Sequence, residues 1–352
     1  MTATTPALQS VIAGVDTHQA THHAAVLDQH GRLLADREFR ADQDGYRSLL
    51  AWVASFGLIG RIGVESTGSY GAGLARHLLA AGIEVIEVNR PEKTTRVMRG
   101  KSDPIDAEAA ARQVLAGRAN AIVKNSTGIV EAIRALKVPR DSAVRERTRA
   151  VLQLRDLITA APSELRDQLL PLSAESRIRK ALTLRPDPQR MADPLQATKR
   201  ALLTLARRIR QLEQEIADAD KILDALVRAA APHLLTLPDV GTQTAAQMLI
   251  TAGQNIDRIH SEAAFARLAG VAPIPASSGK THRTRLSRGG DRQANTALHL
   301  LALRRLRTDP ATRAYRDRRK AQGLGTLDII RCLKRYLART IYNALILDLG
   351  TT

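Results

Sequence analysis

The first 123 residues alternate between short apolar runs and stretches with helical periodicity. Short runs rich in β-branched residues and bounded by turn residues predict strands over 11–16, 22–27, 32–39, 61–65 and 83–88. Apolar positions spaced three and four residues apart predict helices over 44–55, 70–81 and 103–116. The N-terminal part is therefore expected to hold a sheet with helices packed against it.

The order of these elements points to a class of fold. Three strands joined by hairpins, followed by alternating helices and strands, is the order of an RNase H-like domain, which we place at residues 1–124. Other α/β folds share this pattern and stay open. The whole chain is predicted to be α/β in this part and mainly α-helical afterwards.

The middle of the chain, residues 125–231, is predicted to be helical, with a proline-containing linker near 184–194. After the linker, apolar residues between 202 and 226 alternate spacings of three and four, as in a heptad seam. Such a seam must be buried against another helix. Self-association into a dimer or tetramer is one interpretation, and a hairpin with the helix before the linker is the other. The seam consists of Leu202, Leu205, Ile209, Leu212, Ile216, Ala219, Leu223 and Leu226.

The C-terminal part, residues 232–352, is predicted to be helical and strongly basic. The sequence Leu-Pro-Asp-Val-Gly at 237–241 precedes a helical stretch and is similar to the hairpin of a helix-hairpin-helix motif, which can hold a phosphate. A simple turn between helices is the alternative. Between residues 280 and 339 there are 17 Lys or Arg and 4 Asp. Contacts to phosphates explain this imbalance better than solvated helix faces do.

Composition narrows the class of protein. The formal net charge is +18 and the pI is about 10.9, which favours a polyanionic partner such as DNA. A single cysteine, Cys332, excludes a disulfide framework and a cysteine-based zinc site. Apolar runs are too short for a membrane span, and the first ten residues lack the apolar core of a signal peptide. We therefore expect a cytoplasmic, nucleoid-associated protein without a membrane partner.

Four carboxylates lie where the N-terminal domain could bring them together. Asp16 ends the first predicted strand and Glu65 the fourth, so the two are neighbours if these strands are parallel. Asp103 and Asp106 share one face of a helix. Clustered carboxylates need a cation, and oxygen ligands select a hard ion such as Mg²⁺, which can clamp the oxygens of a phosphodiester.

Each of these acids also has a structural interpretation. Asp103 could be a helix N-cap with Pro104 in the first turn and Asp106 near the third position. Asp16 could cap a turn, and Glu65 could be a partly exposed strand end. The sequence alone leaves the catalytic and the structural interpretations open.

The second candidate site is the sequence Ala-Ser-Ser-Gly-Lys-Thr at 276–281. Its last three residues are similar to a phosphate-binding P-loop, but Ile274 stands where that motif requires glycine. A serine in a basic loop could act as a nucleophile toward phosphate, although a structural turn is the commoner role. The residues expected to contact nucleic acid are Lys280, Arg283, Arg285, Arg288 and Arg292.

Histidines are weaker candidates. His18, His22 and His23 suggest a metal site, but their spacing falls at the start of a strand and not on a helix, so we set them aside. His282, beside the serines, is expected to face DNA or solvent.

Short motifs in both halves resemble those of the DEDD transposases of insertion-sequence family 110, which are bridge-RNA-guided DNA recombinases. The motifs occur in the same order over nearly the whole chain and are highly specific together. They include Gly-Val-Asp-Thr at 14–17 and Lys-Ser-Asp-Pro-Ile-Asp-Ala at 101–107. The other matching segments are 64–70, 237–241, 272–273, 278–279 and 288–298.

The resemblance implies an architecture and a chemistry. It implies a RuvC-like domain, a coiled coil and a C-terminal transposase domain. The four family acids fall on Asp16, Glu65, Asp103 and Asp106, which would hold Mg²⁺, and the family's nucleophile falls on Ser278, next to Ser277. The implied reaction joins the serine covalently to DNA before strands are exchanged. It also implies a structured noncoding guide RNA that pairs with donor and target DNA.

Two other functions stay open. A metal-dependent, junction-resolving nuclease would use the acids to hydrolyse DNA, with Ser278 in a structural role. A nucleic-acid-binding protein without activity would have a degenerate acid site, and the intact set of four acids argues against it.

Overall fold

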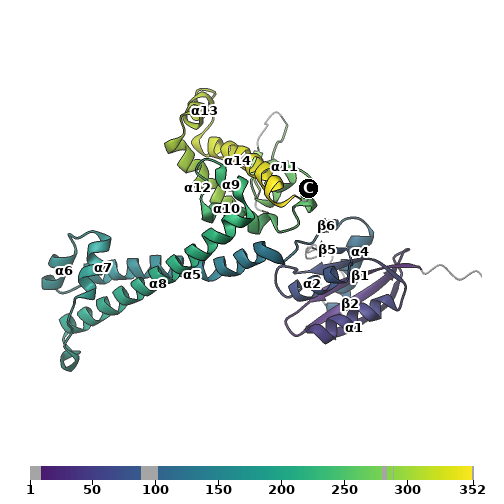
Figure 1. Cartoon of the computed structure of the whole chain (residues 1–352), viewed down its shortest axis with the longest axis horizontal. Helices are drawn as coiled ribbons and strands as arrows, with labels where there is room; N and C mark the ends of the chain where they lie inside the picture. Colours follow the sequence, from purple (N-terminus) through teal and green to yellow (C-terminus); the bar gives the residue numbers. More distant parts are fainter. Residues whose placement is uncertain (1–8, 89–101, 280–283, 288, 351–352) are drawn as a thin grey trace, which may run out of the picture. The chain divides into compact units, whose positions relative to one another are not determined.

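The structure is a computed structural model that describes residues 9–88, 102–279, 284–287 and 289–350 (Figure 1). Its contacts divide the chain into two compact units. The first comprises 1–128 together with 252–261, and the second comprises 129–251 together with 262–351. A short segment of the C-terminal half therefore belongs to the N-terminal unit. The three-part division expected from the sequence stays a prediction.

A six-stranded mixed sheet forms the centre of the first unit. The strands lie in the order β3-β2-β1-β4-β5-β6. β1, β2 and β3 are antiparallel, β4 and β5 run parallel to β1, and β6 is antiparallel to β5. This arrangement confirms the α/β prediction and is consistent with an RNase H-like domain. The strands are β1 (Ser10–Thr17), β2 (Thr21–Asp28), β3 (Leu33–Arg40), β4 (Leu58–Glu65), β5 (Val85–Val88) and β6 (Ala121–Ile122).

Helices cover both faces of this sheet. α1 (Gln43–Ala54) and α2 (Ala72–Ala80) bury Leu49 and Leu78 in a core with Val15 and Val64. α4 (Asp103–Leu115) packs on the opposite face, where its small apolar residues meet the other side of β5. Side chains alternate between the faces of a strand, so residues next to Val15 and Val64 point toward α4.

Two glycines allow α4 to lie close to the sheet. A Cβ atom on Gly14 would lie 2.2 Å from the backbone nitrogen of Ala111 and 2.3 Å from the carbonyl oxygen of Ala107. On Gly63 it would lie 2.7 Å from a methyl group of Val114. The missing side chains set the helix that carries Asp103 and Asp106 directly against the strands that carry the other two acids.

The segment 252–261 completes the edge of the first unit. The side chain of Asn255 accepts a hydrogen bond from the backbone nitrogen of Asn125 at 2.8 Å and donates one to the carbonyl oxygen of Val123 at 3.0 Å. It thereby satisfies backbone groups next to β6 that would otherwise be unpaired. Arg258, in the short 3-10 helix η2 (Ile256–Arg258), donates to the carbonyl oxygen of Ala252 at 2.8 Å.

The second unit begins with a long helical hairpin, in which α5 (Gly128–Thr159) and α8 (Pro194–Ala230) run side by side (Figure 1). Ion pairs between the two helices join Arg140 to Asp220 at 2.8 Å and Arg147 to Glu213 at 2.6 Å. The later residue of α5, Arg147, pairs with the earlier residue of α8, Glu213, so the two helices are antiparallel.

The same hairpin buries part of the predicted heptad seam. Leu202 and Ile209 are fully buried in a core with Leu154 and Ile158 of α5. This supports the hairpin interpretation for the first half of the seam. Self-association, which would use the half-buried residues farther along α8, stays a prediction.

The remaining elements of the second unit are mainly helical. α6 (Ser163–Leu169), α7 (Ala174–Leu182) and the 3-10 helix η1 (Pro188–Arg190) lie between α5 and α8. In the part of the chain that the structure describes, no helix is long and apolar enough to cross a membrane. The C-terminal elements are α9 (Pro232–Thr236), α10 (Thr242–Ala252), α11 (Glu262–Leu268), β7 (Pro273–Pro275), β8 (Thr284–Leu286), α12 (Arg292–Thr308), α13 (Pro310–Ala321) and α14 (Thr326–Leu349).

Candidate active site

Three nearly buried carboxylates gather where β1, β4 and α4 meet. β1 and β4 are parallel with Val15 opposite Val64, so the next residues, Asp16 and Glu65, are neighbours as predicted. The exposed fractions are 7% for Asp16, 4% for Glu65 and 3% for Asp106. These values rule out the interpretation of Glu65 as a partly exposed strand end.

The start of α4 places the other two acids. Ser102 is the N-cap residue of this helix, so Asp103 lies in the first turn and is not the cap, contrary to the structural interpretation of the sequence. Asp106 lies three residues later on the same helix face, next to the alanines that rest on β1. Asp103 is the more exposed of the pair, with 42% of its side chain accessible.

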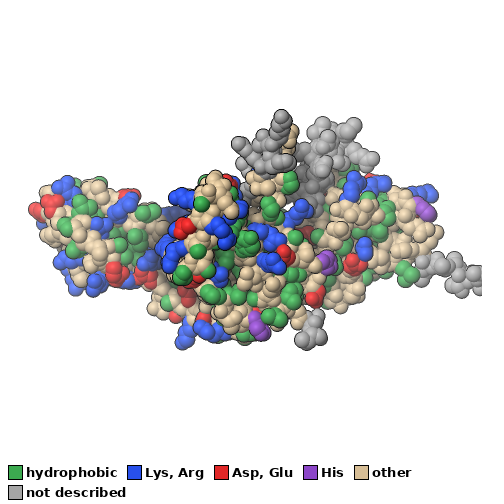
Figure 2. Space-filling model, turned by 90° about the horizontal axis from the view of Figure 1, so that it is seen from above, with side chains coloured by type: hydrophobic (Ala, Val, Ile, Leu, Met, Phe, Trp, Pro, Cys, Tyr) green, Lys and Arg blue, Asp and Glu red, His purple; other side chains and the backbone are tan. Residues whose placement is uncertain are grey.

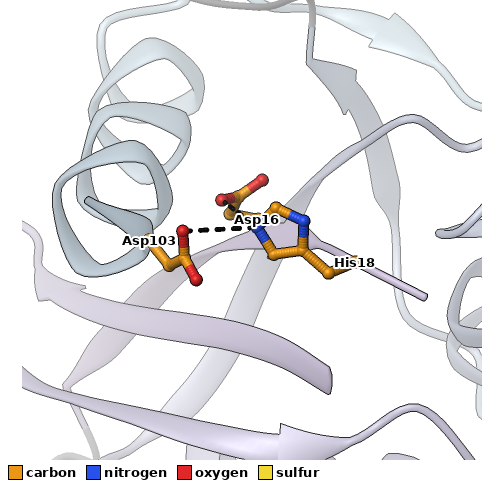
Figure 3. Close-up of side chains that lie close together, drawn as sticks. All are labelled: Asp16, His18 and Asp103. Atoms are coloured by element: carbon orange, nitrogen blue, oxygen red, sulfur yellow. Dashed lines mark ion pairs between the residues drawn. The ribbon is translucent and has the colours of Figure 1, made fainter. Parts of the chain in front are cut away.

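His18 lies between two of the carboxylates (Figure 3). Its Nε2 atom is 3.3 Å from Asp16 Oδ2 and 3.3 Å from Asp103 Oδ1. Ligand atoms of these three residues lie within 4.8 Å of one another, so the group can hold a divalent metal ion. His18, set aside from the spacing of the three histidines, therefore belongs to this candidate group. The relevant spacing is from Asp16 to His18, because residues two apart point to the same side of an extended chain.

The other two histidines have structural contacts instead. His22 is buried and stacks on Tyr46, with the ring centroids 5.6 Å apart. His23 Nε2 lies 2.7 Å from a carboxylate oxygen of Asp36. Neither belongs to the group that can hold a metal.

The pKa of Asp16 is raised by its surroundings in the site. Burial raises the pKa of its carboxyl group, His18 opposes that rise, and the charges of Asp106 and Asp103 add to it. A buried carboxylate surrounded by other carboxylates is costly to ionise unless a cation is present. A donor set made mostly of carboxylate oxygens fits a hard divalent cation.

The turn after β4 holds Glu65 in place. Ser66 adopts a left-handed conformation with a φ of 51°, and its carbonyl oxygen accepts hydrogen bonds from Ser69 at 2.8 Å and Gly71 at 3.2 Å. A Cβ on Gly71 would lie 2.5 Å from the carbonyl oxygen of Glu65. Thr17 also donates to that oxygen, at 3.1 Å. The motif after Glu65 therefore builds a tight, strained turn directly beside the acid cluster.

The candidate nucleophile belongs to the second unit. Ser277 and Ser278 follow β7 in the loop that leads to β8, and both are exposed. The two strands are antiparallel, with Ile274 opposite Arg285. Gly279 has a φ of 54°, the left-handed conformation that glycine adopts most easily. The structure thus groups the acids in one unit and presents the serines on a hairpin of the other.

Of the five residues predicted to contact nucleic acid, two lie in the part of the chain that the structure describes. Arg285 lies on β8 and Arg292 begins α12, and both side chains are exposed. Lys280, Arg283 and Arg288 lie outside the described residues.

A network at the base of the hairpin explains the motif at 288–298. Asp291 caps α12 through the backbone nitrogen of Gln293 at 2.8 Å and accepts a hydrogen bond from Thr251 at 2.7 Å. Asn295 donates to the carbonyl oxygen of Gly270 at 2.6 Å and accepts from the buried Lys334 at 2.7 Å. These bonds fix the chain immediately before β7.

The turn at 237–241 is held by side chains of neighbouring helices. Arg305 donates to the carbonyl oxygen of Pro238 at 3.0 Å. The first residues of α10, Thr242 and Gln243, donate to carboxylates of α8 at 2.6 and 2.7 Å. Phosphate binding at this helix start stays a prediction, and the nearby carboxylates already supply negative charge.

Positive charge is distributed over several patches. On the face drawn in Figure 2, groups of Lys and Arg side chains are separated by hydrophobic and other residues.

Comparison with known proteins gives two family matches. Residues 13–161 match the DEDD transposase model named after IS110, and residues 231–317 match a model described as the IS116/IS110/IS902 transposase family. The first match contains all four acids and the second contains Ser278.

Individual relatives agree with these matches. An uncharacterized 42 kDa protein of insertion element IS900 from Mycobacterium paratuberculosis is 25% identical over 90% of each chain. A putative transposase for the mini-circle IS117 from Streptomyces coelicolor is 25% identical over 89% of this chain and 88% of its own. An uncharacterized 43.6 kDa protein of IS110 from Streptomyces coelicolor is 39% identical over 29% of this chain and 25% of its own.

Proposed function

The chain belongs to the IS110 family of transposases, and from this premise we propose that it cuts and rejoins DNA strands through Ser278, assisted by a metal-binding carboxylate cluster. The observation that carries the proposal is the gathering of Asp16, Glu65 and Asp106 at one end of the sheet, next to His18 and Asp103. Acids arranged in this way support metal-assisted phosphoryl transfer.

The acid cluster would hold the metal ion, Mg²⁺ in this proposal, through Asp16, Glu65, Asp103 and Asp106. When bound, such an ion neutralises charge on the oxygens of a phosphodiester. The protein contributes the fixed positions of the ligands, which come from two parallel strands and one helix. His18 lies against Asp16 and Asp103 and would hold their orientation.

Ser278 would supply the nucleophile. Its Oγ forms a bond to the phosphorus of the scissile phosphodiester while the bond from phosphorus to a sugar oxygen breaks. The serine proton passes to solvent, to which Ser278 is exposed, and the released sugar oxygen takes up a proton. A sugar hydroxyl of another strand then displaces the serine, which restores a phosphodiester without an external energy source.

The arginines and lysine of the serine region would contact the nucleic acid. We propose that Lys280, Arg283, Arg285, Arg288 and Arg292 bind phosphates there. A structured noncoding RNA would pair with donor and target DNA and so choose the sequence, while the protein binds its shape and backbone.

A second copy of the chain completes this proposal. In a dimer or tetramer, the acids of one subunit could serve Ser278 of another. The half-buried residues of the seam, such as Leu212 and Ile216, offer a surface for that contact.

A hydrolytic nuclease is the second candidate. The observation that favours it is that the acid cluster is assembled entirely within the first unit. In that case the acids would cleave DNA with water as the nucleophile, Ser278 would be structural, and no protein would remain attached to the DNA.

A covalent-adduct assay separates the two candidates. Purified protein is mixed with Mg²⁺, labelled donor and target DNA, and RNA transcribed from the flanks of the element, and the products are separated under denaturing conditions. A labelled protein–DNA band that Ser278→Ala abolishes and the matched control Ser277→Ala retains supports the serine mechanism. Cleaved DNA without attached protein would replace it with hydrolysis.

A further inference from the structure

A large cavity opens in the second unit between the β7–β8 hairpin, α13 and α14. Its volume is about 900 Å³, within the range of sites that bind small ligands. Its lining is strongly basic, because five arginines and one carboxylate contribute to it. These residues are Arg285, Arg318, Arg319, Arg331, Arg335 and Asp328.

Two of the five arginines are paired with carboxylates inside the unit. Arg331 lies 2.7 Å from Asp328, and Arg335 lies 3.2 Å from Glu262. The other three arginines of the cavity lining are Arg285, Arg318 and Arg319.

Arg285, Arg318 and Arg319 form no ion pair with any carboxylate among the described residues. Arg319 donates from Nη1 to Gln322 at 2.8 Å, but its Nε is buried without a hydrogen-bond partner in the described part of the chain. A buried guanidinium donor without a partner needs an explanation, and at the wall of a basic cavity a bound anion would supply one. Guanidinium groups bind phosphate oxygens particularly well because their planar donors match them.

Two tyrosines line the same cavity. The rings of Tyr315 and Tyr336 meet edge to face with centroids 5.8 Å apart, and the guanidinium of Arg318 lies 5.5 Å from the centre of the Tyr315 ring. Tyr336 is 57% exposed. The chain has only five tyrosines and one tryptophan, so a large ring at the surface is uncommon in this protein. An exposed ring beside unpaired arginines is the combination on which nucleic-acid bases stack.

We propose that this cavity binds one unpaired nucleotide of a nucleic-acid strand, with its base against Tyr336 and its phosphates on Arg285, Arg318 and Arg319. A duplex keeps its bases stacked inside and cannot place one against the ring, whereas a single strand or an extruded nucleotide can. The inference rests on the proposed function, because Arg285 belongs to the hairpin that carries Ser278. A nucleotide held here would fix the position of a strand beside the serine loop.

The test uses short oligonucleotides in which one adenine is replaced by 2-aminopurine, whose fluorescence is quenched when it stacks. Single-stranded DNA, single-stranded RNA and duplex DNA of one sequence are titrated with the full-length Ser278→Ala protein without divalent metal, so that no cleavage occurs. We expect protein-dependent quenching with a single strand and not with the duplex. The preferred strand, DNA or RNA, identifies the source of the nucleotide.

Matched variants connect the signal to the cavity. Tyr336→Phe should keep the quenching, while Tyr336→Ala should remove it and weaken binding about tenfold, as expected for the loss of one base–aromatic stack. Arg318→Ala should weaken binding without abolishing the quenching, and Arg207→Ala, which removes an exposed arginine of α8 outside the cavity, should change neither.

Quenching that is equal for the duplex, or that survives in Tyr336→Ala, would overturn the inference. Its failure is distinguishable from failure of the proposed function, because the adduct assay measures Ser278 chemistry and the fluorescence measures base stacking without chemistry. A normal adduct without quenching removes only the nucleotide site, and quenching without an adduct removes only the serine mechanism.

Discussion

The acid cluster and the serine hairpin differ in how far their functional side chains are buried. The acids come from two parallel strands and one helix and are nearly buried, with exposed fractions of 7% or less for Asp16, Glu65 and Asp106. Ser278 lies on a loop of a short two-stranded sheet and is exposed. A site that must hold clustered charges in fixed positions is rigid and enclosed, whereas a group that must reach a large polymer lies at the surface.

The supporting residues differ in the same way. Gly14 and Gly63 act by what they lack, because their missing side chains let α4 approach the sheet. The serine hairpin is supported at its base by a hydrogen bond that Asp291 accepts from Thr251 and by one that Asn295 donates to Gly270. Substitutions can therefore damage one region and spare the other, which makes the comparison testable.

The largest expected effect follows from removing one acid. Asp16→Asn should lower the rate of adduct formation by about 10²–10³-fold, because a ligand that would hold the metal loses its charge. Gel quantification of the adduct measures this, and a titration with labelled DNA should show unchanged binding. The matched control is Asp36→Asn, which removes a more exposed acid of the same sheet and should have little effect. Equal losses in the two variants would contradict a specific role for Asp16.

Gly14→Ala should destabilise the first unit through a steric clash. Its Cβ would collide with the backbone of α4, and we expect the free energy of unfolding to fall by about 3 kcal/mol, at the upper end for overpacked cores. Denaturant unfolding of the full chain measures this loss. The control is Gly68→Ala, where no atom lies within 4 Å of the added Cβ. A fully stable Gly14→Ala protein would mean that α4 does not rest on β1 as described.

Asp291→Ala should weaken the second region by a smaller amount. It removes the cap of α12 and the hydrogen bond from Thr251, so we expect a loss of about 1–2 kcal/mol in unfolding free energy and a lower yield of adduct. Metal binding, measured by calorimetry, should stay unchanged. Asp317→Ala removes a surface acid of α13 and should leave the free energy of unfolding nearly unchanged. A loss of metal binding in Asp291→Ala would show that the two regions are not separable.

The smallest expected effect is a gain in stability. Burial and nearby carboxylates raise the pKa of Asp16 in the folded state, so ionising it above the unfolded-state pKa of 3.8 costs stability. With a chelator at neutral pH, Asp16→Asn should therefore raise the melting temperature. The gain should vanish below pH 3.8, where the carboxyl group is protonated in both states. A lower melting temperature at neutral pH would contradict the repulsion among the acids.

The sequence predicted the elements of the first region well because local patterns determine them. Five strands and three helices appear where periodicity placed them, and the parallel pairing of β1 with β4 brings Asp16 beside Glu65 as expected. β6 was missed because a strand of two residues has no periodicity of its own. His18 was set aside from the spacing of neighbouring histidines, because no local pattern shows that its partner Asp103, far along the chain, lies beside it.

Other features depend on contacts that no local pattern encodes. The segment 252–261 joins the first unit through the side chain of Asn255, which bonds to backbone groups about 130 residues earlier. The choice between a hairpin and self-association for the heptad seam likewise depends on which helix packs against residues such as Leu202, and the heptad pattern does not identify that helix. For Ser278, turn composition alone favoured a structural role, and the nucleophile was implied only by the family resemblance.

The most direct test of the account is to identify the amino acid that becomes attached to DNA. The adduct is digested with nuclease and protease, and mass spectrometry locates the remaining nucleotide on a peptide. The account predicts a nucleotide on Ser278, linked through phosphate. A nucleotide on another residue, or cleaved DNA with an unmodified protein, would contradict it.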